Sequence, residues 1–368
     1  MSSHIRHPTS PTIDDADYKK RDDMNRSIQL PVLLTTIFCS ATMASAQQQF
    51  TRTINVDGLN RQYLIYLPTN FDESENMPVM MWHHGGGGTA SEALNYEADF
   101  RSLANSERFI AVYPQAYPDV LESCTCWGYE EPGGYTNGNY DIDLAYTSAV
   151  IDDLAKTYNA DRTRIYAGGY SMGASYVWDL ACVKSDEIAA IAPVAASCYP
   201  WTFEACDPAL PTAICHILGT EDFYAPYNGQ SDWVPSAAAQ HAYWVQKNQA
   251  ETTPETVSLG SGVTRYTWAA GDGCHAVQHF RRQGGGHDVP SFATTAIWEF
   301  VSQHALDGLI ECVDDSIPGD INGDGFVNGS DIAQVLAYWG TGNADADVNG
   351  DGSVGGADIT IVLAAWTG

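Results

Sequence analysis

A serine flanked by two glycines is the strongest candidate for chemistry in this sequence. The segment G-Y-S-M-G at 169–173 has the G-x-S-x-G spacing of a nucleophile elbow, a sharp turn between a strand and a helix. An apolar run at 164–167 precedes it, and a helix-like segment at 174–182 follows it. Such a turn lifts the hydroxyl above the sheet edge, and the helix N-terminus favours the negative charge that develops there. We therefore predict that Ser171 is the nucleophile of an acyl-transfer reaction.

A glycine-rich segment offers donors for the oxyanion that this reaction would form. H-G-G-G-G at 84–88 follows an apolar run at 78–82, which is the usual place for such a loop. Glycine lets the backbone approach a substrate closely and direct an N–H group toward it. We expect the N–H groups of Gly86 and Met172 to form the oxyanion hole, with Gly87 as the alternative to Gly86.

A general base and the acid that orients it must accompany the serine, in the chain order serine, acid, histidine. His287 lies in the segment G-G-G-H-D-V-P, where glycines allow the imidazole to turn toward Ser171. Glu221 and Asp222 both follow a strand-like apolar run, so their position alone leaves the acid open between them. The other histidines of this region lack a glycine-rich setting and are interpreted as structural or surface residues: His216, His241, His275 and His279.

Four segments together carry a family resemblance: 84–88, 169–173, 219–229 and 284–290. They are similar to the polyhydroxybutyrate depolymerase and feruloyl or acetylxylan esterase group of the α/β-hydrolases. That family carries its triad acid in G-T-x-D-x-x-x-P-Y-x-G, so the resemblance selects Asp222 over Glu221. It carries its triad histidine in G-G-G-H-x-W-P, which implies His287. Val289 replaces the tryptophan of this last motif, and the difference is expected to reshape the substrate cleft.

The resemblance implies a serine hydrolase of carboxylic esters that needs no cofactor for its chemistry. Its substrates would be feruloyl or acetyl groups on plant polysaccharide, or a polyester such as polyhydroxybutyrate. Aromatic side chains could hold these groups in the cleft. The candidates are Trp127, Tyr170 and Trp201, with core positions as an equal alternative. Two other functions stay open: a serine peptidase on the same fold, and a docking or adhesion protein with a degenerate hydrolase domain.

Short apolar runs alternate with amphipathic segments over residues 47–313. The runs end in glycine or turn residues, as the strands of a parallel sheet do when both faces are covered. The segments between them carry apolar residues at helical spacing, for example Val150, Ile151 and Leu154. This alternation predicts an α/β domain with a mostly parallel central sheet flanked by helices, the architecture of an α/β-hydrolase.

An internal repeat sets residues 320–368 apart from the rest of the chain. D-I-N-G-D-G at 320–325 recurs as D-V-N-G-D-G at 347–352, and the helix-like segment after each copy repeats at the same offset. Repetition in both loop and helix predicts one duplicated unit, here a small all-α module. The matched apolar pairs are Ile332 and Ile359, Val335 and Val362, Leu336 and Leu363, and Trp339 and Trp366.

Each copy of the repeat has the oxygen-rich spacing of a calcium loop, which wraps six to eight oxygens around one ion. Position 12 is aspartate rather than glutamate, and in this both loops resemble the type I dockerin module. We therefore predict two structural Ca²⁺ sites, and the resemblance implies a cohesin or another cell-surface partner. The predicted ligands are Asp320, Asn322, Asp324, Phe326 through its carbonyl, Asn328 and Asp331, and then Asp347, Asn349, Asp351, Ser353 through its carbonyl and Asp358.

Net charge and the N-terminal segment restrict the partners and the location. The net charge is −29, which argues against nucleic-acid binding because that needs clusters of Lys and Arg. An apolar run at 28–43 followed by A-S-A has the pattern of a secretory signal peptide, and it is too short and too polar to span a membrane. We expect a start at Met24, cleavage after Ala46 and a secreted or surface-attached protein. The predicted boundaries are 1–46 for the extension and signal, 47–313 for the catalytic domain, 314–319 for a linker and 320–368 for the module.

Eight cysteines remain after the predicted cleavage, and an even number in an exported protein favours disulfides. Cys124 and Cys126 are so close in the sequence that each is expected to pair with a more distant cysteine. Cys215 lies inside an apolar run and best fits a buried free thiol.

Overall fold

The computed structural model describes residues 48–119, 124–131, 135–136, 139–230, 234–271, 274–310, 319–322, 327–343 and 346–367. The predicted signal peptide, the linker at 314–318 and two predicted calcium ligands, Asp324 and Phe326, lie outside these residues. The predictions that concern them stay predictions.

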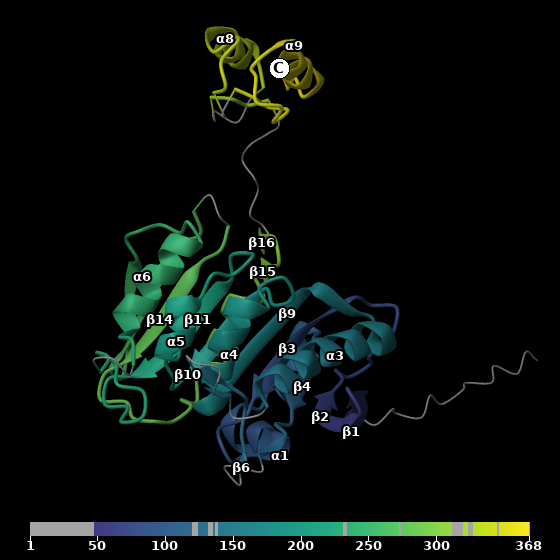
Figure 1. Ribbon diagram of the computed structural model, residues 1–368, viewed down its shortest axis with the longest axis vertical. Coiled ribbons are helices and arrows are strands. Elements are labelled where there is room, and N and C mark those ends of the chain that lie inside the picture. Colours follow the sequence, from purple (N-terminus) through teal and green to yellow (C-terminus); the bar gives the residue numbers. More distant parts are fainter. Residues whose placement is uncertain are drawn as a thin grey trace, which may run out of the picture. The chain divides into compact units, whose positions relative to one another are not determined.

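A ten-stranded sheet organises the larger part of the chain, in the order β1-β2-β4-β3-β9-β10-β11-β14-β13-β12 (Figure 1). The six central strands, from β4 to β14, pair in parallel, and antiparallel pairs extend the sheet at both edges. This confirms the predicted mostly parallel sheet. The strands are β1 Gln49–Val56, β2 Leu59–Tyr66, β3 Met77–His83, β4 Ile110–Pro114, β9 Ala160–Tyr170, β10 Ala190–Val194, β11 Ala213–Gly219, β12 Glu255–Gly260, β13 Val263–Trp268 and β14 Val277–Arg282.

Helices cover both faces of the sheet, and each face has its own apolar core. Strand β3 serves both, because Val79 and Met81 pack into one core while Met80 and Trp82 pack into the other. One core includes residues of α3 Tyr140–Tyr158, α4 Met172–Val183 and α6 Ala237–Lys247. The other includes residues of α1 Ala90–Glu92, the π-helix η1 Ala93–Glu97, α2 Arg101–Glu107 and α7 Ala293–Val301. The remaining short elements are α5 Pro200–Ala205, β5 Pro118–Asp119, β6 Cys124–Thr125, β7 Glu130–Glu131, β8 Tyr135–Thr136, β15 His304–Ala305 and β16 Gly308–Leu309.

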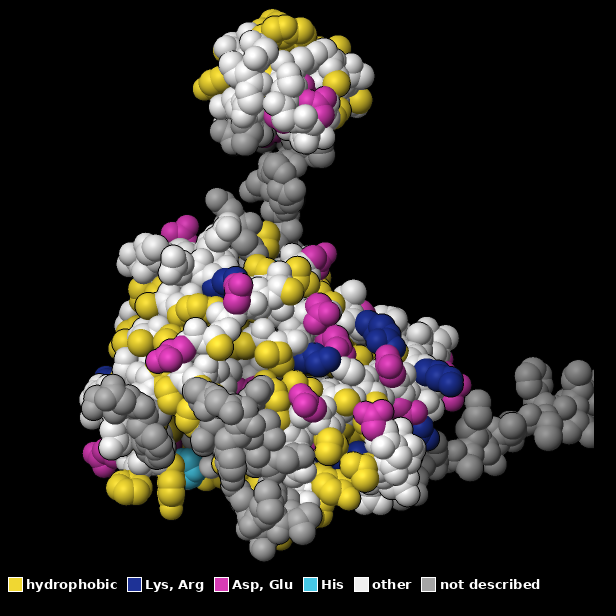
Figure 2. Space-filling view, viewed as in Figure 1, with side chains coloured by type: hydrophobic (Ala, Val, Ile, Leu, Met, Phe, Trp, Pro, Cys, Tyr) yellow, Lys and Arg dark blue, Asp and Glu magenta, His cyan; other side chains and the backbone are white. Residues whose placement is uncertain are grey.

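Charged side chains are dispersed on the face that Figure 2 shows. Lys and Arg are few there, and several lie next to an acidic side chain. Arg162 forms an ion pair with Asp152, and Lys184 forms one with Glu187. On the face shown, acidic side chains are therefore dispersed and form no single cluster.

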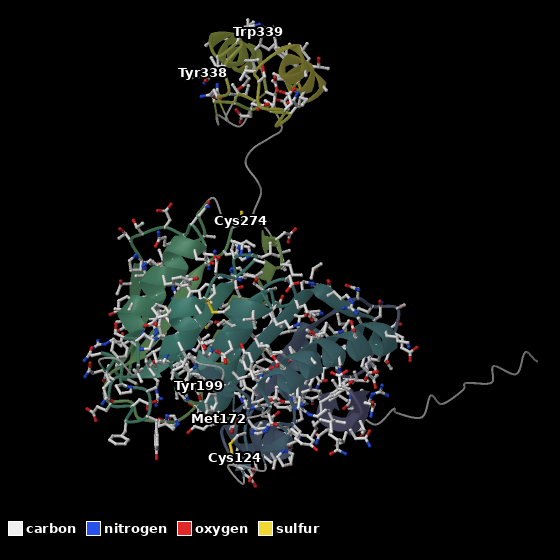
Figure 3. All side chains as sticks on the ribbon, in the orientation of Figure 1. Cys124, Met172, Tyr199, Cys274, Tyr338 and Trp339 are labelled. Carbon is white, nitrogen blue, oxygen red and sulfur yellow. A yellow bond between two sulfur atoms is a disulfide. The ribbon has the colours of Figure 1, made fainter. Side chains whose placement is uncertain are left out.

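Two disulfides are defined within the described part of the chain, Cys124–Cys126 and Cys182–Cys206, and Cys274 is also disulfide-bonded (Figure 3). The prediction that Cys124 and Cys126 pair elsewhere is wrong. The segment that holds them is extended, so side chains two residues apart lie on the same side of the strand, and the Cα atoms are 5.5 Å apart. Cys215 is a buried free thiol as predicted, and Cys198 is another.

The C-terminal module contains two helices of equal length, α8 Gly329–Ala337 and α9 Gly356–Ala364. Its small core unites residues of both copies: Val327, Val335, Ala346, Val354 and Val362. Of the repeated apolar stripe, Val335 and Val362 face this core, whereas the tryptophans at 339 and 366 are about half exposed. No helix within the described ranges is long and apolar enough to cross a membrane.

Candidate active site

The turn that carries Ser171 joins β9 to α4 and holds the serine in a strained conformation. Ser171 has φ 53° and ψ −122°, a region that non-glycine residues rarely adopt. The two flanking glycines make this turn possible. A Cβ atom at Gly169 would lie 2.6 Å from the carbonyl carbon of Gly173, and one at Gly173 would lie 2.2 Å from the carbonyl oxygen of His83. Side chains at either position would therefore collide with backbone.

Three side chains from three loops form one chain of hydrogen bonds. The Oγ of Ser171 lies 2.8 Å from Nε2 of His287, and Nδ1 of His287 lies 3.0 Å from both carboxylate oxygens of Asp222. The serine follows β9, the aspartate follows β11 and the histidine follows β14. The carboxyl ends of parallel strands meet at one edge of a sheet, and residues far apart in sequence come together there.

Asp222 is buried and fixed by its own backbone surroundings. The N–H groups of Tyr224 and Ala225 each donate to Oδ1 over 2.9 Å. Glu221, the alternative acid, is exposed, and its backbone N–H donates to the carbonyl of Gly285. The structure thus brings Asp222 rather than Glu221 to the histidine.

The loop that carries His287 is held from both sides. The hydroxyl of Tyr170 donates to the carbonyl of His287 over 2.9 Å, and the ring of Tyr224 lies 4.7 Å from the imidazole. Arg282 and Asp288 form an ion pair at 2.8 Å across the same loop. These contacts limit the rotation of the imidazole, so its two nitrogens stay directed at the serine and the aspartate.

Most N–H groups of the glycine-rich loop are already used. Gly85 donates to the carboxylate of Glu97, Gly87 donates to the carbonyl of Thr125, and Gly88 donates to the carbonyl of Gly85. Among the described residues, the N–H groups of Gly86 and Met172 have no acceptor. The two residues are neighbours, since a Cβ atom at Gly86 would lie 3.4 Å from Sδ of Met172. Of the two glycines considered, Gly86 is the one whose N–H remains available for an oxyanion.

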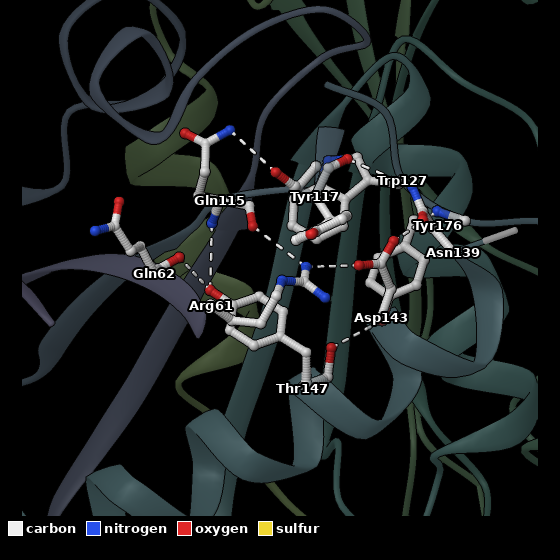
Figure 4. A network of polar contacts seen from close by, with 12 residues as sticks. Arg61, Gln62, Gln115, Tyr117, Trp127, Asn139, Asp143, Thr147 and Tyr176 are labelled. Atoms are coloured by element: carbon white, nitrogen blue, oxygen red, sulfur yellow. Dashed lines mark hydrogen bonds and ion pairs between the residues drawn. The ribbon is translucent and has the colours of Figure 1, made fainter. Parts of the chain in front are cut away.

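A buried network of polar contacts adjoins this loop, and Figure 4 shows the part of it around Arg61 and Asp143. The indole N–H of Trp127 donates to the carbonyl of His84 over 2.8 Å, and the side chain of Gln115 contacts the ring of His84. Arg61 and Asp143 form a buried ion pair at 2.6 Å, and Asp143 accepts the N–H of Gly128 next to Trp127. Burial raises the pKa of Asp143 to about 6, although the pairing with Arg61 lowers it in part.

Two residues near the loop were not predicted from the sequence. Glu97 accepts the N–H of Gly85 and the indole N–H of Trp82, and burial raises its pKa. Thr125 accepts the N–H of Gly87 and donates its hydroxyl to Gly88, so the short disulfide segment is bonded directly to the glycine-rich loop. Neither residue lies in a recognisable sequence motif. Each contacts the loop only because the folded chain brings the two segments together.

Two cavities open on either side of the serine. The first, of about 340 Å³, is lined by Met172, Tyr199 and Trp201, and the second, of about 530 Å³, is lined by the glycine-rich loop, Tyr96 and Tyr170. Ser171, Tyr224 and His287 line both. Tyr199 and Trp201 are stacked, with ring centroids 4.9 Å apart and planes inclined by 9°. An ester placed at Ser171 therefore has room on both sides of the bond that would break.

The structure places two of the three candidate aromatic residues at the cavities and the third in the core, which was the open alternative. Tyr170 and Trp201 line the cavities, but Trp127 does not. Its indole is 1% exposed and stacks on Tyr176 at 5.0 Å, so it fills the space beneath the glycine-rich loop. Tyr96, Tyr199 and Tyr224 are additional aromatic residues of the cavity walls.

The described part of the calcium loops has a ligand set that fits Ca²⁺. In the second loop, Asp347, Asn349 and Asp351 accept backbone N–H groups of the same loop, which gathers their oxygens on one turn. Asp358 accepts the N–H groups of Asn349 and Gly355. Carboxylate, amide and carbonyl oxygens are the hard ligands that Ca²⁺ prefers.

The first loop repeats this pattern where it is described. Asp331 is buried and accepts the N–H groups of Ile321, Asn322 and Asn328. Asn328 is also the N-cap of α8, because its side-chain oxygen accepts the N–H of Ser330. In each loop, the aspartate at position 12 therefore accepts N–H groups from equivalent positions of the loop backbone.

Comparison with known proteins gives two family matches. Residues 56–289 match a family described as "Putative esterase", and residues 318–365 match "Dockerin type I domain", a family that in general binds calcium. A bifunctional acetylxylan esterase/xylanase of Neocallimastix patriciarum is 28% identical over 260 residues, which cover 69% of this chain and 35% of that protein. A poly(3-hydroxyalkanoate) depolymerase C of Paucimonas lemoignei is 23% identical over 300 residues, covering 74% of this chain and 69% of that protein. The chain thus spans only about a third of the first of these relatives.

A solved acetyl xylan esterase from Aspergillus awamori has the same fold. It superimposes with a TM-score of 0.50 and 16% sequence identity, covering 69% of this chain and 99% of that one. The larger part of the chain therefore has the α/β-hydrolase architecture that the sequence predicts.

Proposed function

Because this chain belongs to the esterase family whose model matches residues 56–289, we propose that it is a serine carboxylic-ester hydrolase with Ser171, His287 and Asp222 as its triad. One observation carries the proposal: the 2.8 Å contact from serine to histidine and the 3.0 Å contacts from histidine to aspartate form one continuous chain. This is the geometry of a nucleophile, its base and an orienting acid.

Each residue has a defined step in this reaction. Nε2 of His287 takes the proton of Ser171 as the oxygen attacks the acyl carbon, while Asp222 holds the N–H at Nδ1. The N–H groups of Gly86 and Met172 stabilise the oxyanion, a contribution of roughly 3 kcal/mol per donor in comparable enzymes. His287 then protonates the leaving alcohol, and water releases the acyl group by the same steps.

The substrate is proposed to be an ester on polysaccharide or in a polyester. The two relatives are named for acetylxylan and for poly(3-hydroxyalkanoate), and both of these polymers contain carboxylic esters. The stacked Tyr199 and Trp201 suit a flat acyl group such as feruloyl, since aromatic rings stack favourably. A panel of acetylated xylan, feruloyl esters and polyhydroxybutyrate measures the preference.

A serine-reactive fluorophosphonate tests the site directly. We expect the wild-type chain to be labelled once, at Ser171, and the Ser171→Ala variant to remain unlabelled. The Ser175→Ala variant is the matched control, because Ser175 lines the same cavity on the next turn of α4. A wild-type chain that does not react would instead favour a docking or adhesion protein with a degenerate hydrolase domain.

The C-terminal module is proposed to bind two Ca²⁺ ions and to attach the enzyme to a cohesin-type partner. The dockerin match at 318–365 and the paired loops support this role. Each repeat also exposes the same apolar pair, Leu336 with Trp339 and Leu363 with Trp366. Export is proposed as well, because the disulfides fit an oxidising compartment.

A further inference from the structure

Three buried histidines lie together in the fold. In the sequence they are distant from Ser171, and none of them lines either cavity of the active site. His216 of β11 and His279 of β14 are directly opposite each other in the parallel pairing, and His241 of α6 lies over the same face. Their exposed fractions are 0%, 1% and 4%. One ring nitrogen of each lies within 4.8 Å of one ring nitrogen of the other two.

The hydrogen bonds of two rings direct a lone pair into this cluster. Nε2 of His216 lies 2.9 Å from the carbonyl of Ala196 and can only donate to it, so Nδ1 carries the lone pair. Nδ1 of His279 lies 3.0 Å from the carbonyl of His216 and donates in the same way, so Nε2 carries the lone pair. A backbone carbonyl that accepts the outer N–H is the usual support of a histidine that binds a metal.

The third ring completes the arrangement. Nε2 of His241 lies 3.1 Å from Nδ1 of His216, so in the metal-free protein Nε2 of His241 carries the proton between them. Metal binding through this nitrogen would shift the proton to Nδ1 of the His241 ring. Neutral imidazole is the form that binds a metal.

A cavity of about 670 Å³ gives access to the cluster. It is lined by His241 and His279 and by aromatic residues that include Tyr227, Tyr266 and Trp268. The hydroxyl of Tyr227 lies 3.0 Å from Nε2 of His279, so a phenol oxygen or a water can occupy a fourth position.

We propose that His216 through Nδ1 and His241 and His279 through Nε2 bind one transition-metal dication of the Zn²⁺ class. Three imidazoles suit Zn²⁺ and its neighbours rather than Ca²⁺, which prefers oxygen. Zinc holds nitrogen at roughly 2.0–2.1 Å, which sets the nitrogens about 3.4 Å apart. Because the three nitrogens lie within 4.8 Å of one another, the widest pair must close by up to about 1.4 Å. The ion would join β11, β14 and α6 and would brace Tyr227 in the segment that follows Asp222.

Metal uptake by the full chain, prepared without a histidine tag and kept in excess Ca²⁺, tests the site. We expect the wild-type chain to bind one more Zn²⁺ than the His241→Gln variant. With Co²⁺ the wild-type chain should give the visible absorption of a tetrahedral centre, and the variant should lose it. The His304→Gln variant is the matched control, because His304 is buried but outside the cluster.

Thermal unfolding provides a second readout that does not depend on the variants. Zn²⁺ at about 100 times its dissociation constant should raise the melting temperature of the wild-type chain by roughly 5 °C or more. Equal zinc uptake by wild type and His241→Gln, or a wild-type chain without the Co²⁺ absorption, would overturn the proposal. Ester hydrolysis is measured alongside, and its presence or absence bears on the proposed function separately.

Discussion

At the residue scale, the proposed reaction depends on three side chains whose positions are fixed by their neighbours. Ser171 is fixed by a strained turn, His287 by the hydroxyl of Tyr170, and Asp222 by two backbone N–H groups. The nucleophile, the base and the acid are therefore aligned before substrate arrives, and preorganised groups of this kind need little rearrangement during the reaction.

The choice between the two adjacent acids gives a direct prediction. Asp222→Asn should lower kcat by about 10⁴-fold, because the amide no longer holds His287 in the tautomer that accepts the serine proton. Glu221→Gln is the matched control and should change kcat less than about twofold, since this side chain is exposed. Steady-state hydrolysis of an aryl ester compares them, and the reverse order would transfer the role to Glu221.

A second carboxyl predicts how stability depends on pH. Asp179 on α4 is fully buried, and burial raises its pKa to about 7. Between about pH 4 and pH 7 the folded chain keeps this proton and the unfolded chain loses it, so stability falls as the pH rises.

Asp179→Asn removes this penalty. Its stability relative to wild type should increase from pH 4 to pH 8, by an amount on the order of 4 kcal/mol at most. Urea unfolding at both pH values measures the change, and Asp186→Asn, at an exposed position, serves as control. A difference from wild type that stays constant with pH would contradict the assignment.

At the element scale, the site depends on where strands end and how closely loops approach them. The elbow requires glycine at 173 because a Cβ atom there would lie 2.2 Å from the carbonyl oxygen of His83 on β3. We expect Gly173→Ala to destabilise the fold by about 3 kcal/mol, seen as a lower urea midpoint. Gly286→Ala should stay within about 0.5 kcal/mol, since a Cβ atom there meets nothing within 4 Å. Equal midpoints for the two variants would contradict the close approach.

The elbow and the histidine loop could be predicted from the sequence because their constraints are local. A tight turn needs glycines at fixed offsets, and buried parallel strands are continuous apolar runs. Only part of the cavity walls could be predicted: Tyr170 and Trp201 were candidates, whereas Tyr199 and Tyr224 come from separate loops that meet only in the folded chain. The sequence left cleft and core open for Trp127 for the same reason: its burial depends on Tyr176 of α4, and no local sequence pattern indicates that contact.

At the scale of the whole molecule, two cores of very different size are joined in one chain. Five apolar residues are fully buried in the described part of the C-terminal module, so we expect ion binding to supply much of its folding energy. Wild type should bind two Ca²⁺ ions by calorimetry, and Asp358→Ala should bind one, because only the second loop loses its twelfth ligand. Asp186→Ala is the control and should still bind two. Two ions bound by Asp358→Ala would contradict the assignment.

The cooperation of Ser171 and His287 is the central claim, and a double-mutant comparison tests it most directly. Residues that act as one unit lose their function together, so Ser171→Ala and His287→Ala should each lower kcat by about 10⁶-fold. The double variant should then be no more than a few-fold slower than either single variant. Single variants near wild-type activity, or losses that multiply in the double variant, would contradict the account.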